Sequence, residues 1–143
     1  IIKIGVEAHE TAALSNGTPG IMQGMKTYML QTDDGSKSLG GSSLGAGIQY
    51  FSVGPQHAFL KDQGVVKYTS ATDKEILEAY KLIASTEGIC SALEPMAGAA
   101  ELIKQAKNKP KDYLICLNLC GTGEKDLNTI QEHIGKDFEW KIR

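Results

Sequence analysis

The second half of the chain alternates strand-like segments with helix-like segments, and this alternation restricts the possible folds more than any other feature. A strand predicted over 65–70 precedes a helix over 72–88, and a second helix over 95–108 precedes the apolar run 112–119. Alternation of this kind is typical of βαβ units, in which consecutive strands are parallel. We therefore predict an α/β fold with an open, mostly parallel sheet and helices on both faces.

Two of these segments have clear sequence signatures. Thr72-Asp73-Lys74-Glu75 has the S/T-x-x-E form of a capping box, apolar residues follow at helical spacing, and Gly88 ends the helix. The run Asp112–Leu119 is almost continuously apolar. Such a run is typical of a parallel strand that is buried on both faces, so we predict a buried strand there.

The first half is predicted to be less regular, with a short buried strand at its start and a long loop rich in Gly and Ser. The chain opens directly with the apolar sequence IIKIGVE, and we expect residues 1–143 to form a single partial domain of a longer protein. The other predicted segments are a loop with a short helix over 8–20, a strand over 25–31, a turn over 32–35 with a return over 36–39, a loop over 40–54, and a helix over 55–63.

Composition excludes several classes of function. Fifteen basic and 17 acidic residues give a net charge of −2, and Arg143 is the only arginine, so we expect no nucleic-acid partner. No apolar stretch approaches the roughly 20 residues that cross a bilayer, so we expect no membrane span. The three cysteines show no CxxC spacing, which favours reduced thiols and a cytoplasmic protein.

The segment Cys120–Asp126 (CGTGEKD) is the sharpest candidate for a ligand site, because it follows the predicted buried strand and ligands bind beyond the carboxyl ends of parallel strands. It matches neither dinucleotide nor P-loop patterns, and an ordinary strand-to-helix turn is the alternative. Glu7 follows the first predicted strand, and Glu87 lies at the end of the helix predicted over 72–88. A carboxylate at either position indicates a functional role or simple exposure to solvent. His57 has no second ligand at metal spacing, so a structural histidine is the alternative to a base or ligand.

Five segments together resemble one known family. They match, in order, patterns in the C-terminal part of the tryptophan synthase beta subunit, a pyridoxal-phosphate enzyme of the tryptophan-synthase-like fold. The matching segments are IGVE at 4–7, GMKTYMLQ at 24–31, GAGIQYFSVGPQHAFLKD at 45–62, EGICSALE at 87–94 and NLCGTGEKD at 118–126. The resemblance implies the C-terminal part of that fold, and covers nearly the whole chain.

The resemblance implies a set of cofactor-binding residues. Glu87 corresponds to the family's glutamate beside the cofactor ring, and Gly88 matches next to it. Cys120 stands where the family has a serine facing the pyridine nitrogen, and a thiol is a weaker hydrogen-bond partner. Gly121 matches the family's turn that forms this side of the cofactor pocket. Tyr50 and Ser52 lie where family backbone carbonyls hold a monovalent cation.

Other family features are missing or changed here. The family's aspartate before the YPSVGP-like segment is Gln49, which removes a charge used in closing the active site. No segment resembles the surroundings of the family's Schiff-base lysine or its GGGSN-type phosphate loop, so we expect no catalytic residue in this chain. Pyridoxal-phosphate catalysis needs that lysine and phosphate site, so we predict that the chain alone is inactive and binds no cofactor.

Two hypotheses follow. The first is a C-terminal fragment of a tryptophan-synthase-beta-like lyase, whose full-length form joins L-serine and indole to make L-tryptophan. That enzyme would use pyridoxal phosphate, pair with an alpha subunit and form a homodimer. The second is a degenerate, non-catalytic relative that acts as a binding or assembly domain. In either case an incomplete sheet exposes strand edges and apolar surface, so we expect the fragment to self-associate.

Overall fold

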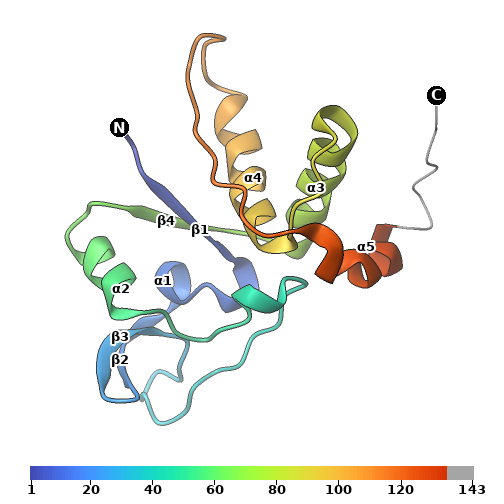
Figure 1. Ribbon diagram of the computed structural model, residues 1–143. Coiled ribbons are helices and arrows are strands. Elements are labelled where there is room, and N and C mark those ends of the chain that lie inside the picture. Colours follow the sequence, from blue (N-terminus) through green and yellow to red (C-terminus); the bar gives the residue numbers. More distant parts are fainter. Residues whose placement is uncertain (135–143) are drawn as a thin grey trace.

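The computed structural model describes residues 1–134 as a mixed α/β arrangement (Figure 1). Residues 1–134 contain one parallel and one antiparallel pair of strands, together with five α-helices. The strands are β1 (Ile4–Ala8), β2 (Thr18–Met22), β3 (Met25–Met29) and β4 (Lys67–Ala71). The helices are α1 (Ala13–Asn16), α2 (Pro55–Asp62), α3 (Asp73–Glu87), α4 (Leu93–Ala106) and α5 (Leu127–Ile134), with 3₁₀ turns at His9–Thr11, Ala46–Ile48 and Gly123–Asp126.

The core lies where the parallel pair meets α3 and α4. In the β1–β4 pair, Ile4 lies opposite Lys67 and Ala8 opposite Ala71, so the two strands are parallel. The chain between them contains α1, β2, β3 and α2, so this pair is not the βαβ unit that the sequence predicts in the second half. Helix α4 packs against both strands and against α3, and α1 also contacts both strands. The cluster of buried apolar residues comprises Ala8, Ala71, Ile76, Ala79, Tyr80, Leu93, Met96, Ala97, Ala99, Ala100 and Ile134.

Helix α3 begins and ends where the sequence predicts. The Glu75 amide donates to the Thr72 hydroxyl at 3.3 Å, and the Thr72 amide donates to the Glu75 carboxylate at 2.9 Å, so the capping box is confirmed. Gly88 ends the helix with φ of 68°, a conformation that side chains with a Cβ disfavour. Helix α4 begins at Leu93, two residues before the predicted start.

The antiparallel pair was predicted only in part. The strand over 25–31 is confirmed as β3, but β2 occupies residues where a loop was expected. Its sequence, TPGIM, contains Pro and Gly, which disfavour a strand unless a neighbour pairs with it. The expected return over 36–39 pairs only through an isolated bridge between Gln31 and Ser38.

The prediction of a buried strand over 112–119 is wrong. Within residues 1–134 this segment joins no sheet, most of its residues are exposed, and the Leu114 side chain is 94% exposed. A strand needs a neighbour to satisfy its amide and carbonyl groups, whereas this segment runs alongside α4 (Figure 1). The described sheets therefore have two strands each, and not the open multi-stranded sheet that the sequence predicts.

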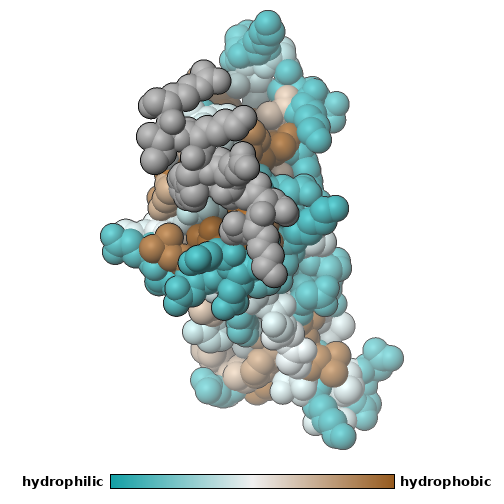
Figure 2. Space-filling model, turned by 90° about the vertical axis from the view of Figure 1, so that its right-hand side faces the viewer, coloured by the Kyte–Doolittle hydropathy of each residue, from teal (hydrophilic) through white to brown (hydrophobic). Residues whose placement is uncertain are grey.

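The surface of the molecule mixes polar and apolar side chains. Figure 2 shows both kinds on the side that carries α3 and α5. Leu82 of α3 is 44% exposed and Leu127 of α5 is 54% exposed, which is common for single side chains on helices. No helix within residues 1–134 combines the length and the apolar character that a membrane span requires.

Candidate functional site

Backbone hydrogen bonds join the segment after α3 to the turn after residue 119. Ser91 and Thr122 form an isolated antiparallel bridge. The Ala92 amide donates to the Gly121 carbonyl at 3.3 Å, and the Gly123 amide donates to the Cys90 carbonyl at 3.1 Å. The structure therefore brings together the two segments in which the resemblance places the cofactor-binding residues.

Glycine at position 121 is required by this close approach. Its φ is +78°, and a Cβ added there would lie 3.0 Å from the Cβ of Ala92. A Cβ at Gly123 would lie 2.9 Å from the carbonyl oxygens of Cys90 and Ser91. Side chains at these two positions would push the turn away from the 88–93 segment, so the glycines determine how closely the segments pack.

The predicted cofactor-binding side chains lie on an exposed surface. Glu87 is the last residue of α3 and is exposed, as are Gly88, Cys120 and Gly121. Cys120 is a free thiol whose carbonyl accepts a long hydrogen bond of 3.5 Å from the Ser91 hydroxyl. Other residues line the groove beside β1 and the hollow beside the start of α3. Residues 87–88 and 120–121 therefore lie on open surface, and they are together called the wall below.

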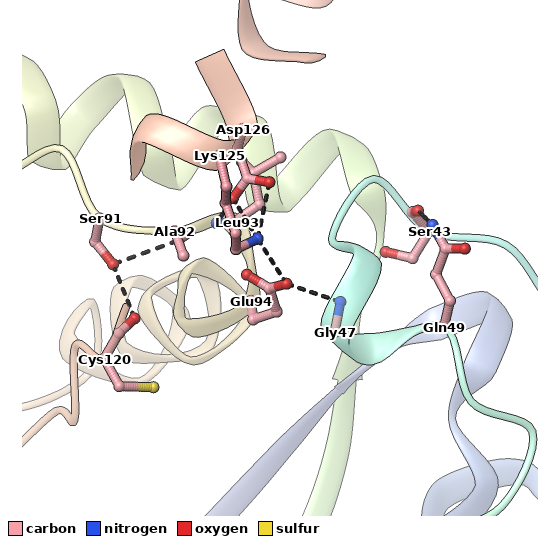
Figure 3. Close-up of polar contacts among 10 residues, drawn as sticks. All are labelled: Ser43, Gly47, Gln49, Ser91, Ala92, Leu93, Glu94, Cys120, Lys125 and Asp126. Carbon is pink, nitrogen blue, oxygen red and sulfur yellow. Dashed lines mark hydrogen bonds and ion pairs between the residues drawn. The ribbon is translucent and has the colours of Figure 1, made fainter. Parts of the chain in front are cut away.

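A compact ionic group lies beside this wall (Figure 3). The Lys125 ammonium lies 2.8 Å from Oε1 of Glu94 and 2.8 Å from Oδ1 of Asp126. Oδ2 of the buried Asp126 accepts the amide of Leu93 at 2.8 Å, and Oε1 of Glu94 accepts the amide of Gly47 at 2.8 Å. Asp126 directly precedes α5 in the chain, but its carboxylate accepts the amide at the start of α4.

The charges of this group stabilise one another. Partial burial is the largest single influence and would raise the pKa of Glu94, but the hydrogen bonds from Lys125 and from backbone amides, together with the charge of Lys125, outweigh it, and the pKa is lowered. Burial likewise opposes the charged form of Lys125, yet its hydrogen bonds to Asp126 and Glu94 raise its pKa. Nearby, burial and a hydrogen bond with Cys90 raise the pKa of Tyr80 to about 12. All three groups therefore keep their usual protonation states at neutral pH.

Residues 51–53 lie beside β3. Ser52 forms an antiparallel bridge with Met29, and the Phe51 carbonyl accepts the Leu30 amide at 2.7 Å. Among residues 1–134, the carbonyls of Tyr50 and Ser52 accept no hydrogen bond.

Gln49 makes a contact that the family's aspartate could not make. Its side-chain amide donates to the Ser43 carbonyl, and the Ser43 hydroxyl donates to Asp73 at 2.8 Å. A carboxylate has no proton to donate in this way at neutral pH. Gln49 thus helps to hold the 40–54 loop against the start of α3, a role that the sequence did not reveal.

Two further candidates have structural partners. The Glu7 carboxylate accepts the amides of Leu14 and Ser15 at 2.9 and 2.8 Å, and the Ser15 hydroxyl at 2.8 Å, so it holds the start of α1. The His57 ring nitrogen Nδ1 lies 2.9 Å from the hydroxyl of Tyr68. The structural interpretation that the sequence left open fits His57. Glu7, for which function or simple exposure was expected, is instead half-buried and has a structural role. Nothing in the sequence after Glu7 indicated its contacts with Leu14 and Ser15.

Comparison with known proteins shows what the chain is related to. It is 45% identical to the tryptophan synthase beta chain of Dinoroseobacter shibae over 148 aligned positions, which cover 97% of this chain. The chain is homologous to tryptophan synthase beta chains. The beta chain of Ruegeria pomeroyi is 45% identical over 94% of this chain, and that of Cereibacter sphaeroides 43% identical over 95%. No protein-family model matches the chain.

The homology covers only part of these relatives. The chain spans 36% of the length of the D. shibae protein, 34% of the R. pomeroyi protein and 35% of the C. sphaeroides protein. The resemblance of the five sequence segments to the family is therefore confirmed, over about a third of the length of a beta chain.

Proposed function

We propose that residues 1–143 are a single partial domain, the C-terminal cofactor-domain portion of a cytoplasmic, tryptophan-synthase-beta-like lyase. The complete enzyme would join L-serine and indole to form L-tryptophan. The observation that carries this proposal is the homology to tryptophan synthase beta chains along 97% of the chain. Because the homologous part is about a third of a beta chain, the lysine and phosphate loop that the activity needs must come from other polypeptide.

The wall formed by residues 87–88 and 120–121 supports this proposal. When bound, pyridoxal phosphate would act as an electron sink for the bonds broken and formed at the substrate. Glu87 would place a carboxylate beside the ring, and the Cys120 thiol would face the pyridine nitrogen. The positive φ of Gly121 supports this arrangement, because a residue without a Cβ lets the turn pack against Ala92 and keeps residues 120–121 close to the segment after α3.

The carbonyls of Tyr50 and Ser52 are proposed ligands of a monovalent cation. Within residues 1–134 neither carbonyl accepts a hydrogen bond, which leaves their lone pairs available. Carbonyl oxygens suit hard cations, and they tolerate changes in the side chain that carries them. The proposal therefore does not depend on which side chains stand at 50 and 52.

An incomplete sheet supports the need for further polypeptide. β1 pairs only with β4, and the apolar run 112–119 pairs with no strand within residues 1–134. Between them lies an open groove of about 580 Å³ with mostly apolar walls, and α4 forms its floor. The exposed Ile1, Ile2 and Leu114 lie along this groove. In the complete enzyme, the rest of the beta chain would cover it.

Partners follow from the same proposal. An alpha subunit would supply indole, and two beta chains would form a homodimer. The isolated chain would self-associate through its open groove and unpaired strand edge, because exposed edges and apolar patches promote association. Sedimentation velocity at increasing protein concentration measures this, and a species that stays monomeric at all concentrations contradicts it.

A chimera tests the enzymatic proposal. In it, the segment of the D. shibae beta chain that matches this chain is replaced by residues 1–143. We expect the chimera with pyridoxal phosphate to convert L-serine and indole to L-tryptophan, whereas the 143-residue chain alone forms none. The unaltered D. shibae beta chain serves as the positive control. A chimera that folds and binds the cofactor but forms no tryptophan overturns the proposal.

A non-catalytic binding or assembly domain is the second candidate, and two residues favour it. Cys120 replaces a hydroxyl by a weaker hydrogen-bond partner, and Gln49 is engaged with Ser43 and carries no charge. Cys120→Ser and Gln49→Asp in the chimera separate the candidates. If tryptophan formation appears only after these changes, the chain is a degenerate relative.

A further inference from the structure

We propose that Glu94 is a positioning residue that holds two separate turns in one fixed arrangement. The turns are residues 45–49 and residues 120–126, and the function of the second rests on the proposed cofactor wall. Glu94 itself lies in the first turn of α4. Neither the resemblance nor the homology assigns it a role.

One carboxylate oxygen makes both connections. Oε1 of Glu94 accepts the amide of Gly47 from the first turn and the ammonium of Lys125 from the second, each at 2.8 Å (Figure 3). A Cβ at Gly47 would lie 2.8 Å from this oxygen, so a side chain at position 47 would displace the Glu94 carboxylate. Any displacement of Oε1 therefore changes the contacts of both turns.

The second turn cannot move independently of the α4 terminus. Lys125 also binds Asp126, and Asp126 accepts the Leu93 amide at 2.8 Å. Gly123, in the same turn, donates its amide to the carbonyl of Cys90, which belongs to the 88–93 segment. These contacts make the turn, the start of α4 and the 88–93 segment one unit, and Glu94 connects that unit to residues 45–49.

The strength of the connection comes from its charge. Hydrogen bonds between ionised groups are roughly twice as strong as neutral ones. The Glu94 side chain is 18% exposed and the Lys125 side chain 48% exposed, so water screens the Glu94 end of this contact less than it screens a fully exposed ion pair. The net effect is a lowered pKa at Glu94, which keeps the carboxylate charged at neutral pH.

The inference has a direct test in the 143-residue chain, by amide hydrogen exchange. Glu94→Gln keeps the shape of the side chain and removes its charge. We expect exchange to accelerate about tenfold or more at both Gly47 and Gly123, as for loss of a hydrogen bond to a charged group. The matched control is Glu78→Gln, because Glu78 is an exposed glutamate paired with Lys74 at 3.9 Å. The control should change neither amide.

A second variant guards against loss of folding. Exchange at Ile83, in the middle of α3, reports whether each variant stays folded. If Glu94→Gln unfolds the chain, Lys125→Met removes the ammonium and leaves the contact between Glu94 and Gly47 possible. It should then accelerate exchange at Gly47 as well as at Gly123. Acceleration on one side only, or on neither, overturns the positioning role.

The chimera supplies the catalytic readout. Glu94→Gln in the chimera should lower kcat by about tenfold to a hundredfold, as small misplacements of a catalytic wall do, and leave KM for indole unchanged. Glu78→Gln should alter neither constant. An inactive parent chimera counts against the proposed enzyme, whereas the exchange experiment still decides the positioning role. An unchanged kcat in Glu94→Gln removes the catalytic part of the inference.

Discussion

Two regions of the chain are similarly apolar and have opposite fates in the structure. Leu93, Met96 and Ala97 of α4 are almost completely buried, and they form the centre of the core. Leu114 and Ile115, in the run 112–119, are 94% and 40% exposed. Apolar character is therefore insufficient to predict burial.

The difference lies in the backbone. A helix satisfies its own amide and carbonyl groups, so α4 needs only another apolar face, and α3 provides it. A buried strand must find neighbours for its backbone on both edges. Residues 112–119 lack such neighbours within residues 1–134, and β1 has an unpaired edge on the same groove.

The largest expected effect compares the same substitution in the two regions. Leu93→Ala removes a side chain that is 0% exposed and should lower the free energy of unfolding by about 2–5 kcal/mol. Leu114→Ala changes an exposed side chain and should alter it by less than about 0.5 kcal/mol. Urea unfolding of both variants measures this. Equal losses would mean that 112–119 is buried in solution.

The junction between the two regions gives a smaller effect. Gly121→Ala should cost about 1–2 kcal/mol for the positive φ, and further for the 3.0 Å contact between the new Cβ and Ala92. Gly24→Ala is the matched control, because its φ is +81° and a Cβ there meets no atom within 4 Å. Thermal unfolding should rank Gly121→Ala as the more destabilising change, and the reverse order contradicts the close packing.

Local encoding of the helix pair can be tested at the start of α3. Thr72→Ala removes the hydroxyl that accepts the Glu75 amide and should cost about 1 kcal/mol of unfolding free energy. Thr72→Ser keeps the acceptor and should restore most of the loss. If both variants are equally destabilised in urea unfolding, the capping box does not stabilise α3.

The smallest effect is a dependence of the helix pair on pH. Glu75 of α3 lies 2.9 Å from Lys104 of α4, and this hydrogen bond lowers the pKa of the Glu75 carboxyl below the usual range of a glutamate. Between the pKa of Glu75 in the folded chain and its higher pKa in the unfolded chain, the unfolded chain binds more protons. Acidification therefore favours unfolding, and the stability that this pair contributes is lost as pH falls through the pKa of the folded state. Both groups are partly exposed, so the loss should stay below about 1 kcal/mol.

Glu75→Gln provides the measurement for this pair. Its thermal midpoint should fall less steeply than that of the unaltered chain between about pH 5 and pH 3, because the titrating carboxylate is gone. A variant with the same slope would show that other carboxylates, such as Glu94, account for the acid sensitivity of the chain.

Features with a local cause were predictable from the sequence. The capping box of Thr72, the helix end at Gly88 and the helix after Pro55 depend on neighbours within a few residues, and all three are confirmed. The candidate site was less accessible. The segments that contain Glu87 and Cys120 lie side by side because of backbone hydrogen bonds between residues about 30 apart in the sequence. No spacing of residues within the sequence reveals such bonds.

The sequence by itself determined the helices of the second half and the relation to tryptophan synthase beta chains, and it indicated parallel strands without revealing that β1 pairs with β4. Only the tertiary structure decided that 112–119 lies open beside α4, that Glu7 holds α1, and that Asp126 caps α4 and not α5. The physical reason is the range of the forces involved. Caps and apolar periodicity act within one or two turns, whereas strand pairing and ionic contacts depend on which distant groups the fold brings within hydrogen-bond distance.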